Sequence, residues 1–200
     1  YCLEVAQACR EAGLKTVAVT AGYVSGSARE AFFQGMDAAN VDLKGFSDAF
    51  YRHYCSARLE PVLETLEYLA QEGRTWTEIT NLLIPDANDS EADLEALTTW
   101  VADRLGRDVP LHFSAFHPAH RLLDRSPTPL SSLRRARAIA LGKGLRFVYL
   151  GNARDAEGST TFCPGCGKAV IARDGYRIAA LRLRGGACAD CGTILPGRFD

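Results

Sequence analysis

The chain has 200 residues, of which 47% are hydrophobic, and its 23 Lys and Arg residues nearly balance 24 Asp and Glu residues. No basic block stands out, which argues against nucleic acid or an anionic membrane surface as a partner. No apolar run approaches the roughly 18 residues that a spanning helix needs, and no secretory pattern opens the chain. We therefore expect a cytoplasmic protein with one main domain and an appendage.

The first residues already follow a helical rhythm. Apolar or small side chains recur along one stripe, at Leu3, Ala6, Cys9 and Ala12. Gly13 is a typical helix stop, but no Met, Ser, Thr, Asp or Asn precedes the helix as a start or cap. We therefore expect further sequence upstream of this chain.

Short strands and amphipathic helices alternate from there to about residue 152. Runs of Val, Ile and Leu predict strands at 16–21, 38–44, 77–84, 111–116 and 146–151. The apolar spacing predicts helices at 26–35, 46–56, 59–72, 90–105 and 131–143. Such alternation is typical of an α/β fold with a parallel sheet and right-handed crossovers. About five strand–helix units are expected, which indicates either a partial barrel or a doubly wound sheet.

Polar or small residues lie at or just after the carboxyl ends of the predicted strands: Thr20, Gly22, Tyr23, Asp42, Lys44, Pro85, Asn88, Asp89, His117 and Asn152. Ligands of parallel α/β sheets bind at the carboxyl ends of the strands, so together these residues predict a ligand site. Taken singly, Asn88 and Asp89 could only cap the next helix, and Lys44 could be a solvated loop residue. His117 could equally be a partly buried, hydrogen-bonded imidazole.

Four of the seven cysteines form two C-x-x-C pairs, Cys163 with Cys166 and Cys188 with Cys191, separated by 21 residues. This pattern is typical of a zinc-ribbon-like site with tetrahedral Zn²⁺. Four thiolates leave no open coordination position, so such a site would be structural. A mononuclear iron site, a thioredoxin-like redox pair and two disulfides are the alternatives.

The tail from about residue 160 has few large apolar side chains, so we expect it to need the metal for folding. Alternating apolar residues predict a hairpin with a small core, made by Val170, Ile171, Tyr176, Ile178, Leu181 and Leu183. We accordingly divide the chain into a main domain over 1–152 and a metal-binding unit over 153–200.

Several long motifs occur in an order that is familiar from one group of enzymes. They are VTAGY (19–23), VDLKGF (41–46), ITNLLIPDANDS (79–90), HFSAFHPAHRL (112–122), the run from 126 to 152, and the closing cysteine pairs. By these motifs the chain resembles the radical SAM enzymes of the AmmeMemoRadiSam system, which are relatives of the pyruvate formate-lyase activating enzymes. The resemblance covers essentially all 200 residues.

The resemblance implies a partial (βα)6 barrel that holds S-adenosylmethionine (SAM) at a [4Fe–4S] cluster. Reductive cleavage of SAM would give methionine and a 5′-deoxyadenosyl radical, which abstracts a hydrogen atom from the substrate. The cluster cysteines of such enzymes follow a C-x3-C-x2-C pattern, which this chain lacks. We therefore expect them upstream, and we expect this chain alone to be inactive.

The SAM-binding residues expected from the resemblance are Thr20, Gly22, Asp42, Lys44, Asn88 and His117. Lys44 matches a lysine that reaches the SAM carboxylate, and His117 matches a histidine that approaches the adenosyl ribose. Thr20 and Gly22 match a run that is often Thr-Asn-Gly in the family, with Ala21 here in place of the Asn.

The resemblance also suggests partners: Memo-like and AMMECR-like proteins, and an electron donor such as flavodoxin or ferredoxin. The substrate, whether a protein or a small molecule, is not indicated. Two other classes of function stay open, a non-radical aldolase-like barrel in which Lys44 forms a Schiff base, and a zinc-ribbon protein-binding module on an inert barrel.

Overall fold

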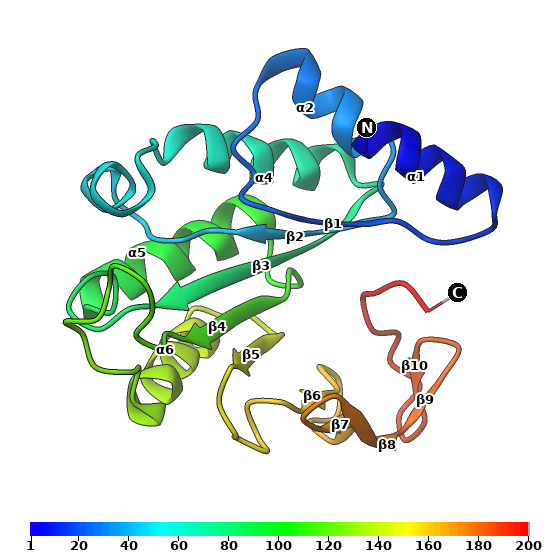
Figure 1. Ribbon diagram of the computed structural model, residues 1–200. Coiled ribbons are helices and arrows are strands. Elements are labelled where there is room, and N and C mark those ends of the chain that lie inside the picture. Colours follow the sequence, from blue (N-terminus) through cyan, green and yellow to red (C-terminus); the bar gives the residue numbers. More distant parts are fainter. Residues whose placement is uncertain (200) are drawn as a thin grey trace.

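A five-stranded parallel sheet forms the main part of the molecule (Figure 1). The computed structural model describes residues 1–199. The strands are β1 (Val17–Thr20), β2 (Ala38–Asp42), β3 (Trp76–Leu83), β4 (Leu111–Ala115) and β5 (Val148–Gly151). All neighbours are parallel and follow each other in sequence order. A doubly wound sheet would reverse its strand order, so the sequential order identifies barrel-type winding.

One helix precedes the first strand, and the others lie between consecutive strands. The helices are α1 (Cys2–Glu11), α2 (Gly26–Phe33), α3 (Asp48–Phe50), α4 (Glu60–Glu72), α5 (Glu91–Trp100) and α6 (Leu130–Gly142). Two π-helical turns, η1 (Tyr51–Cys55) and η2 (Val101–Leu105), continue α3 and α5. The helices predicted at 46–56 and 90–105 therefore do not stay α-helical to their ends. None of the helices within residues 1–199 is long and apolar enough to cross a bilayer.

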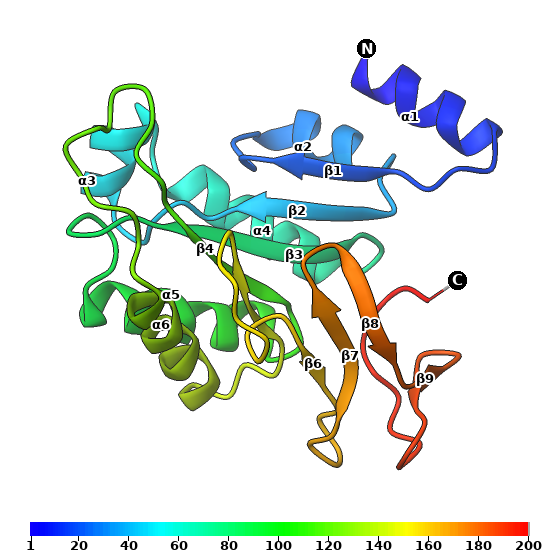
Figure 2. The same cartoon turned by 60° about the horizontal axis from the view of Figure 1, so that its bottom comes forward.

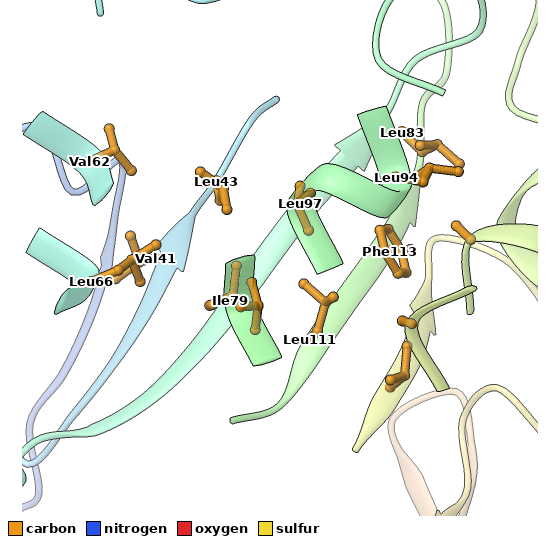
Figure 3. Close-up of a cluster of buried hydrophobic side chains, with 14 of the residues drawn as sticks. Val41, Leu43, Val62, Leu66, Ile79, Leu83, Leu94, Leu97, Leu111 and Phe113 are labelled. Carbon is orange, nitrogen blue, oxygen red and sulfur yellow. The ribbon is translucent and has the colours of Figure 1, made fainter. Parts of the chain in front are cut away.

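The helices bury one face of the sheet, and this face is apolar. Its fully buried side chains include Val41, Ile79, Leu83, Leu111 and Phe113 from the three central strands and Leu43, which directly follows β2. Figure 3 shows them against Val62 and Leu66 of α4 and Leu94 and Leu97 of α5. Burial of each such side chain contributes about 1.5–3 kcal/mol, and together they hold the strands in a rigid frame.

The opposite face of the sheet is open and polar. Side chains alternate along a strand, so this face receives the residues that lie between the core positions. They are half-buried and include Asn40, Asp42, Glu78, Thr80, His112 and Tyr149. A sheet face with so many accessible polar groups is the natural place to look for a functional site.

The tail forms small antiparallel sheets beside the amino-terminal ends of the main strands (Figures 1 and 2). One sheet has β6 (Thr161–Phe162), β7 (Ala169–Asp174) and β8 (Arg177–Leu181). The other pairs β9 (Leu183–Arg184) with β10 (Ala187–Cys188). The tail therefore lies away from the carboxyl ends of the strands, where ligands of such sheets bind.

The predicted hairpin exists, since β7 pairs with β8, and its expected core is confirmed for Val170, Ile171 and Leu183. The prediction is wrong for Tyr176, in the turn before β8, and for Ile178 and Leu181, which are exposed like every other residue of β8. The small core of the tail contains Val170 with Cys163, Cys188 and Leu195, and it also takes in Phe147 from the segment before β5. The tail is therefore packed onto the main sheet through Phe147.

Candidate functional site

An ion pair lies at the carboxyl end of β2. The Nζ atom of Lys44 is 2.7 Å from Oδ2 of Asp42, the last residue of the strand. The two side chains are 36% and 27% exposed, respectively, so the pair is held at the surface of the open face. An ammonium has three donors, and the Asp42 contact uses one of them. The remaining donors can bind an anionic group of a ligand.

Three side chains from other segments hold the backbone beside this pair. Asn81 of β3 donates from Nδ2 to the Leu43 carbonyl at 2.7 Å, and Asn88 donates to the Lys44 carbonyl at 2.7 Å. The Lys44 N–H donates to the hydroxyl of Tyr51 at 3.1 Å. Sequence reasoning did not identify Tyr51 or Asn81. The one signal was an Asn among the apolar residues of a predicted strand.

Asn88 is turned toward the backbone of its own turn. Its Nδ2 also donates to the Leu82 carbonyl at 2.9 Å, and its Oδ1 accepts from the Ile84 N–H at 2.7 Å. The side chain is 4% exposed. Its amide is therefore engaged on both sides by backbone groups. The neighbouring Asp89 accepts from the Asp86 N–H at 2.8 Å, as expected of a residue that caps a turn.

Thr20 and Gly22 shape the turn after β1. The Gly22 N–H donates to Oγ1 of Thr20 at 3.1 Å, and the Gly22 carbonyl accepts from Thr65 at 2.7 Å. Gly22 has φ +65°, and a Cβ there would lie 2.7 Å from a methyl group of Val41. Only glycine fits this close turn, which places the backbone of residues 20–22 at the same end of the sheet as Lys44.

His117 lies at the carboxyl end of β4 and is exposed. Its Nε2 is 3.5 Å from the Asn152 carbonyl, which is the outer limit of a hydrogen bond. Asn152, just after β5, has φ +55° and donates to the Ala115 carbonyl at 3.3 Å. The imidazole is therefore accessible to a ligand and is not the buried group that was considered as an alternative.

A second polar cluster on the open face lies toward the amino-terminal ends of the strands. His112 is 2.7 Å from Glu78 and stacks on Tyr149 with ring centroids 5.0 Å apart. The Tyr149 hydroxyl is 2.9 Å from Thr161 of the tail, to which Arg173 donates at 3.0 Å. Burial would raise the pKa of Glu78, but the hydrogen bonds with His112 and Trp76 and the nearby charge of Arg173 together hold that pKa below the ordinary value. This cluster joins the tail to the sheet.

The four tail cysteines converge. Their Sγ atoms all lie within 4.8 Å of one another, with Cys163 to Cys191 at 3.6 Å and Cys166 to Cys188 at 3.8 Å. A tetrahedral ion with metal–sulfur bonds of about 2.3 Å separates its ligands by about 3.8 Å. These contacts join one C-x-x-C pair to the other, and all the cysteines are free thiols. The arrangement fits one metal ion and does not contain the two disulfides considered as an alternative.

Hydrogen bonds to sulfur prepare this set for a cation. The Gly165 N–H donates to Cys163 at 3.4 Å, and the Thr193 hydroxyl lies 3.2 Å from Cys191. The hydrogen bond with Thr193 lowers the pKa of the Cys191 thiol to about 6, which favours the thiolate form that a metal ion binds. Four sulfurs leave no open position, as expected of a structural site.

Comparison with known proteins shows how much of a longer relative this chain covers. No family model matches it. An uncharacterized protein of Methanocaldococcus jannaschii is 43% identical over 185 residues, which are 92% of this chain and 54% of that protein. The chain therefore spans about half the length of the curated relative that it matches.

Solved structures with a similar fold include radical SAM enzymes. A domain of a pyruvate-formate lyase-activating enzyme from Bacteroides vulgatus has a TM-score of 0.66 at 14% identity, over 75% of this chain and 89% of that domain. Streptococcus suis SuiB bound to S-adenosylmethionine has a TM-score of 0.57 at 14% identity, over 76% of this chain and 36% of SuiB. At such low identity the likeness shows the fold, and the chain has the general fold of radical SAM enzymes.

Proposed function

We propose that this chain is part of a radical SAM enzyme of the AmmeMemoRadiSam system and that the carboxyl ends of its strands form part of the SAM site. The observation that carries the proposal is the Asp42–Lys44 pair. It presents a partly exposed ammonium at the end of the sheet where ligands of this architecture bind. The fold of the chain agrees with such a role.

The residues present suit a ligand with the chemistry of SAM. We propose that the Lys44 ammonium binds the methionyl carboxylate, and that Asp42 restrains the ammonium. The exposed imidazole of His117 would approach the ribose, which offers hydroxyl groups for hydrogen bonds. The tight turn at Thr20 and Gly22 would let the ligand approach the backbone. SAM supplies a 5′-deoxyadenosyl radical for hydrogen abstraction in enzymes of this class.

The cysteines of this chain do not suit the cluster that such chemistry needs. Cys2 and Cys9 lie on α1, Cys55 lies in η1, and the other four are gathered in the tail. We propose that the cluster ligands belong to a part of the full-length protein that this chain does not include. The match to only 54% of a longer relative supports this division. This chain alone would then be inactive.

The tail has a different role in this proposal. Cys163, Cys166, Cys188 and Cys191 would bind one Zn²⁺ or iron ion that holds the tail against the sheet. The proposed division of the chain at 152/153 therefore separates a part that binds SAM from a part that binds a structural metal. Memo-like and AMMECR-like proteins and a flavodoxin or ferredoxin remain the partners we propose, and cytoplasm remains the proposed location.

An aldolase-like enzyme is the second candidate. It would need Lys44 as a free amine, whereas the observed contact holds this side chain against a carboxylate at 2.7 Å. This contact favours an anion-binding role. A protein-binding module on an inert barrel would not explain the polar side chains on the open face of the sheet.

The test uses the full-length protein, purified and reconstituted with iron and sulfide without oxygen. We expect an iron–sulfur absorption band, and 5′-deoxyadenosine when SAM and dithionite are added. The matched control is the same protein with the cysteines of the expected upstream C-x3-C-x2-C motif changed to alanine, which should form no [4Fe–4S] cluster and no 5′-deoxyadenosine. A full-length protein that takes up no cluster and leaves SAM intact would contradict the proposal.

A further inference from the structure

We propose that Tyr51, Asn81 and Asn88 are positioning residues that clamp the backbone of residues 43–44 and thereby aim the Lys44 ammonium at its ligand. This inference rests on the proposed function and adds a device for specificity to it. The three side chains come from η1, β3 and the turn after β3, so they are brought together only by the fold.

Beyond the end of β2, the hydrogen bonds of the clamp take the place of the hydrogen bonds between strands. Asp42 is the last residue of β2 in register with β3, opposite Thr80, and the Leu43 N–H makes a further bond to the Thr80 carbonyl at 2.9 Å. Beyond that point, side chains bind the Leu43 carbonyl and both backbone groups of Lys44. A loop would ordinarily leave such groups to water and stay mobile.

Asn81 is an unfavourable residue at a buried position, which indicates that it has a role besides packing. Asn81 is 1% exposed and lies between the fully buried Ile79 and Leu83 on the helix-covered face. Within the described part of the chain, its Oδ1 has no hydrogen-bond partner. A buried, unpaired amide oxygen is unfavourable, and leucine has a similar size without that oxygen. The amide does, however, donate a hydrogen bond from Nδ2 to the Leu43 carbonyl, which leucine could not.

Gly45 and Phe50 further restrain the backbone that follows Lys44. A Cβ on Gly45 would lie 2.5 Å from the ring of Phe50, so the chain after Lys44 is pressed against α3. Lys44 is therefore fixed at its Cα by the clamp and at its Nζ by Asp42. A lysine that is free to rotate loses side-chain entropy when it binds, and a restrained lysine loses less.

The same hydrogen bonds give Asn88 a different role from the direct SAM contact that the resemblance implied. Its amide already binds the Lys44 carbonyl, the Leu82 carbonyl and the Ile84 N–H. It acts on the ligand through Lys44 and does not touch it.

The test compares SAM affinity with fold stability in the full-length, cluster-containing protein. Asn81→Leu removes an unpaired buried oxygen but also leaves the buried Leu43 carbonyl without its donor, so the melting temperature measured without SAM should change little. The substitution should nevertheless weaken SAM binding about tenfold, since one restraint on Lys44 is lost. Tyr51→Phe keeps the ring and should act in the same direction. Thr98→Val, an equally buried change on α5 that removes the hydroxyl bonded to the Leu94 carbonyl, is the control and should leave SAM affinity unchanged.

The Asn81→Leu, Lys44→Ala double variant separates the possible failures. If Asn81 acts only through Lys44, the double variant should bind SAM no more weakly than Lys44→Ala alone. Additive losses, or affinity that falls only together with melting temperature, would overturn the positioning role. If Lys44→Ala itself leaves SAM affinity unchanged, the proposed SAM contact fails. If Lys44→Ala weakens binding but Asn81→Leu and Tyr51→Phe do not, only the clamp fails.

Discussion

His112 and Glu78 form a hydrogen-bonded pair across β4 and β3, with Nε2 2.7 Å from Oε2. The pair lies on the open face of the sheet, and the ring of His112 stacks on Tyr149, which in turn contacts Thr161 of the tail. The contact between the tail and the sheet therefore includes a titratable carboxylate.

The stability of the chain should depend on this carboxylate below neutral pH. Burial alone would raise the pKa of Glu78, but the hydrogen bonds with His112 and Trp76 and the charges of His112 and Arg173 together lower it from its ordinary 4.5. A group with a lowered pKa stabilises the folded state above its unfolded pKa and ceases to do so as pH falls through the folded pKa. Glu78→Gln should therefore melt roughly 2–4 °C below the wild type at pH 7, and the difference should shrink below pH 4.5. Melting curves followed by circular dichroism between pH 7 and pH 3 would measure this, and a difference that stayed constant would contradict it.

Lys44→Ala should weaken SAM binding to the full-length protein. The charge-assisted contact with a carboxylate is worth about 1.5–3 kcal/mol, or about 10- to 150-fold in affinity. Isothermal titration calorimetry would measure the loss. Lys143→Ala is the matched control, because Lys143 follows α6 and pairs with Glu95 of α5 at 3.4 Å. Equal affinities of the two variants would reduce Lys44 to a surface residue.

The purified 200-residue chain should contain about one equivalent of Zn²⁺ or iron. Replacement of both Cys163 and Cys166 by serine should remove the metal and make the chain sensitive to protease beyond residue 160, because metal binding stabilises the tail. The main sheet should survive, since its large apolar core is made by other residues. Metal analysis and limited proteolysis would test this, with Cys2→Ser, at an exposed cysteine, as the control. Retained metal and protease resistance in the double variant would refute the structural site.

Gly165→Ala should weaken metal binding although no ligand is changed. A Cβ at this position would lie 2.1 Å from Oγ1 of Thr193, which contacts Cys191. Groups that orient metal ligands typically affect affinity by about 10- to 100-fold. Competition with a chromophoric chelator would measure the loss. Gly165→Ala with Thr193→Ala should recover part of the affinity, because the clash is removed, and a further loss in that variant would argue against a steric cause.

The periodicity of the sequence was sufficient to predict the strands and most helices of the main sheet. Their spacing follows from which side chains must face a core, and such spacing is visible in one dimension. The same reasoning placed Lys44 at the carboxyl end of the second strand, and the spacing of the cysteines predicted that all four would meet.

What could not be predicted depends on partners that are distant in the chain. Asn81 and Tyr51 matter through bonds to the backbone of residues 43–44, and nothing local in the sequence specifies those bonds. The Glu78–His112 pair depends on how β3 and β4 align. The alternation in β8 resembled that of a half-buried strand, yet Ile178 and Leu181 are exposed because no element packs on them.

The same strands end in two very different surroundings, with Lys44 at one end and the cysteine-bearing tail packed near the other. A substitution among the loops at the Lys44 end leaves the contacts between tail and sheet in place. Evolution can therefore alter which molecule is recognised at one end of the strands while the other end maintains the fold. In such a protein, the residues that maintain stability and the residues that change with the substrate can be different ones.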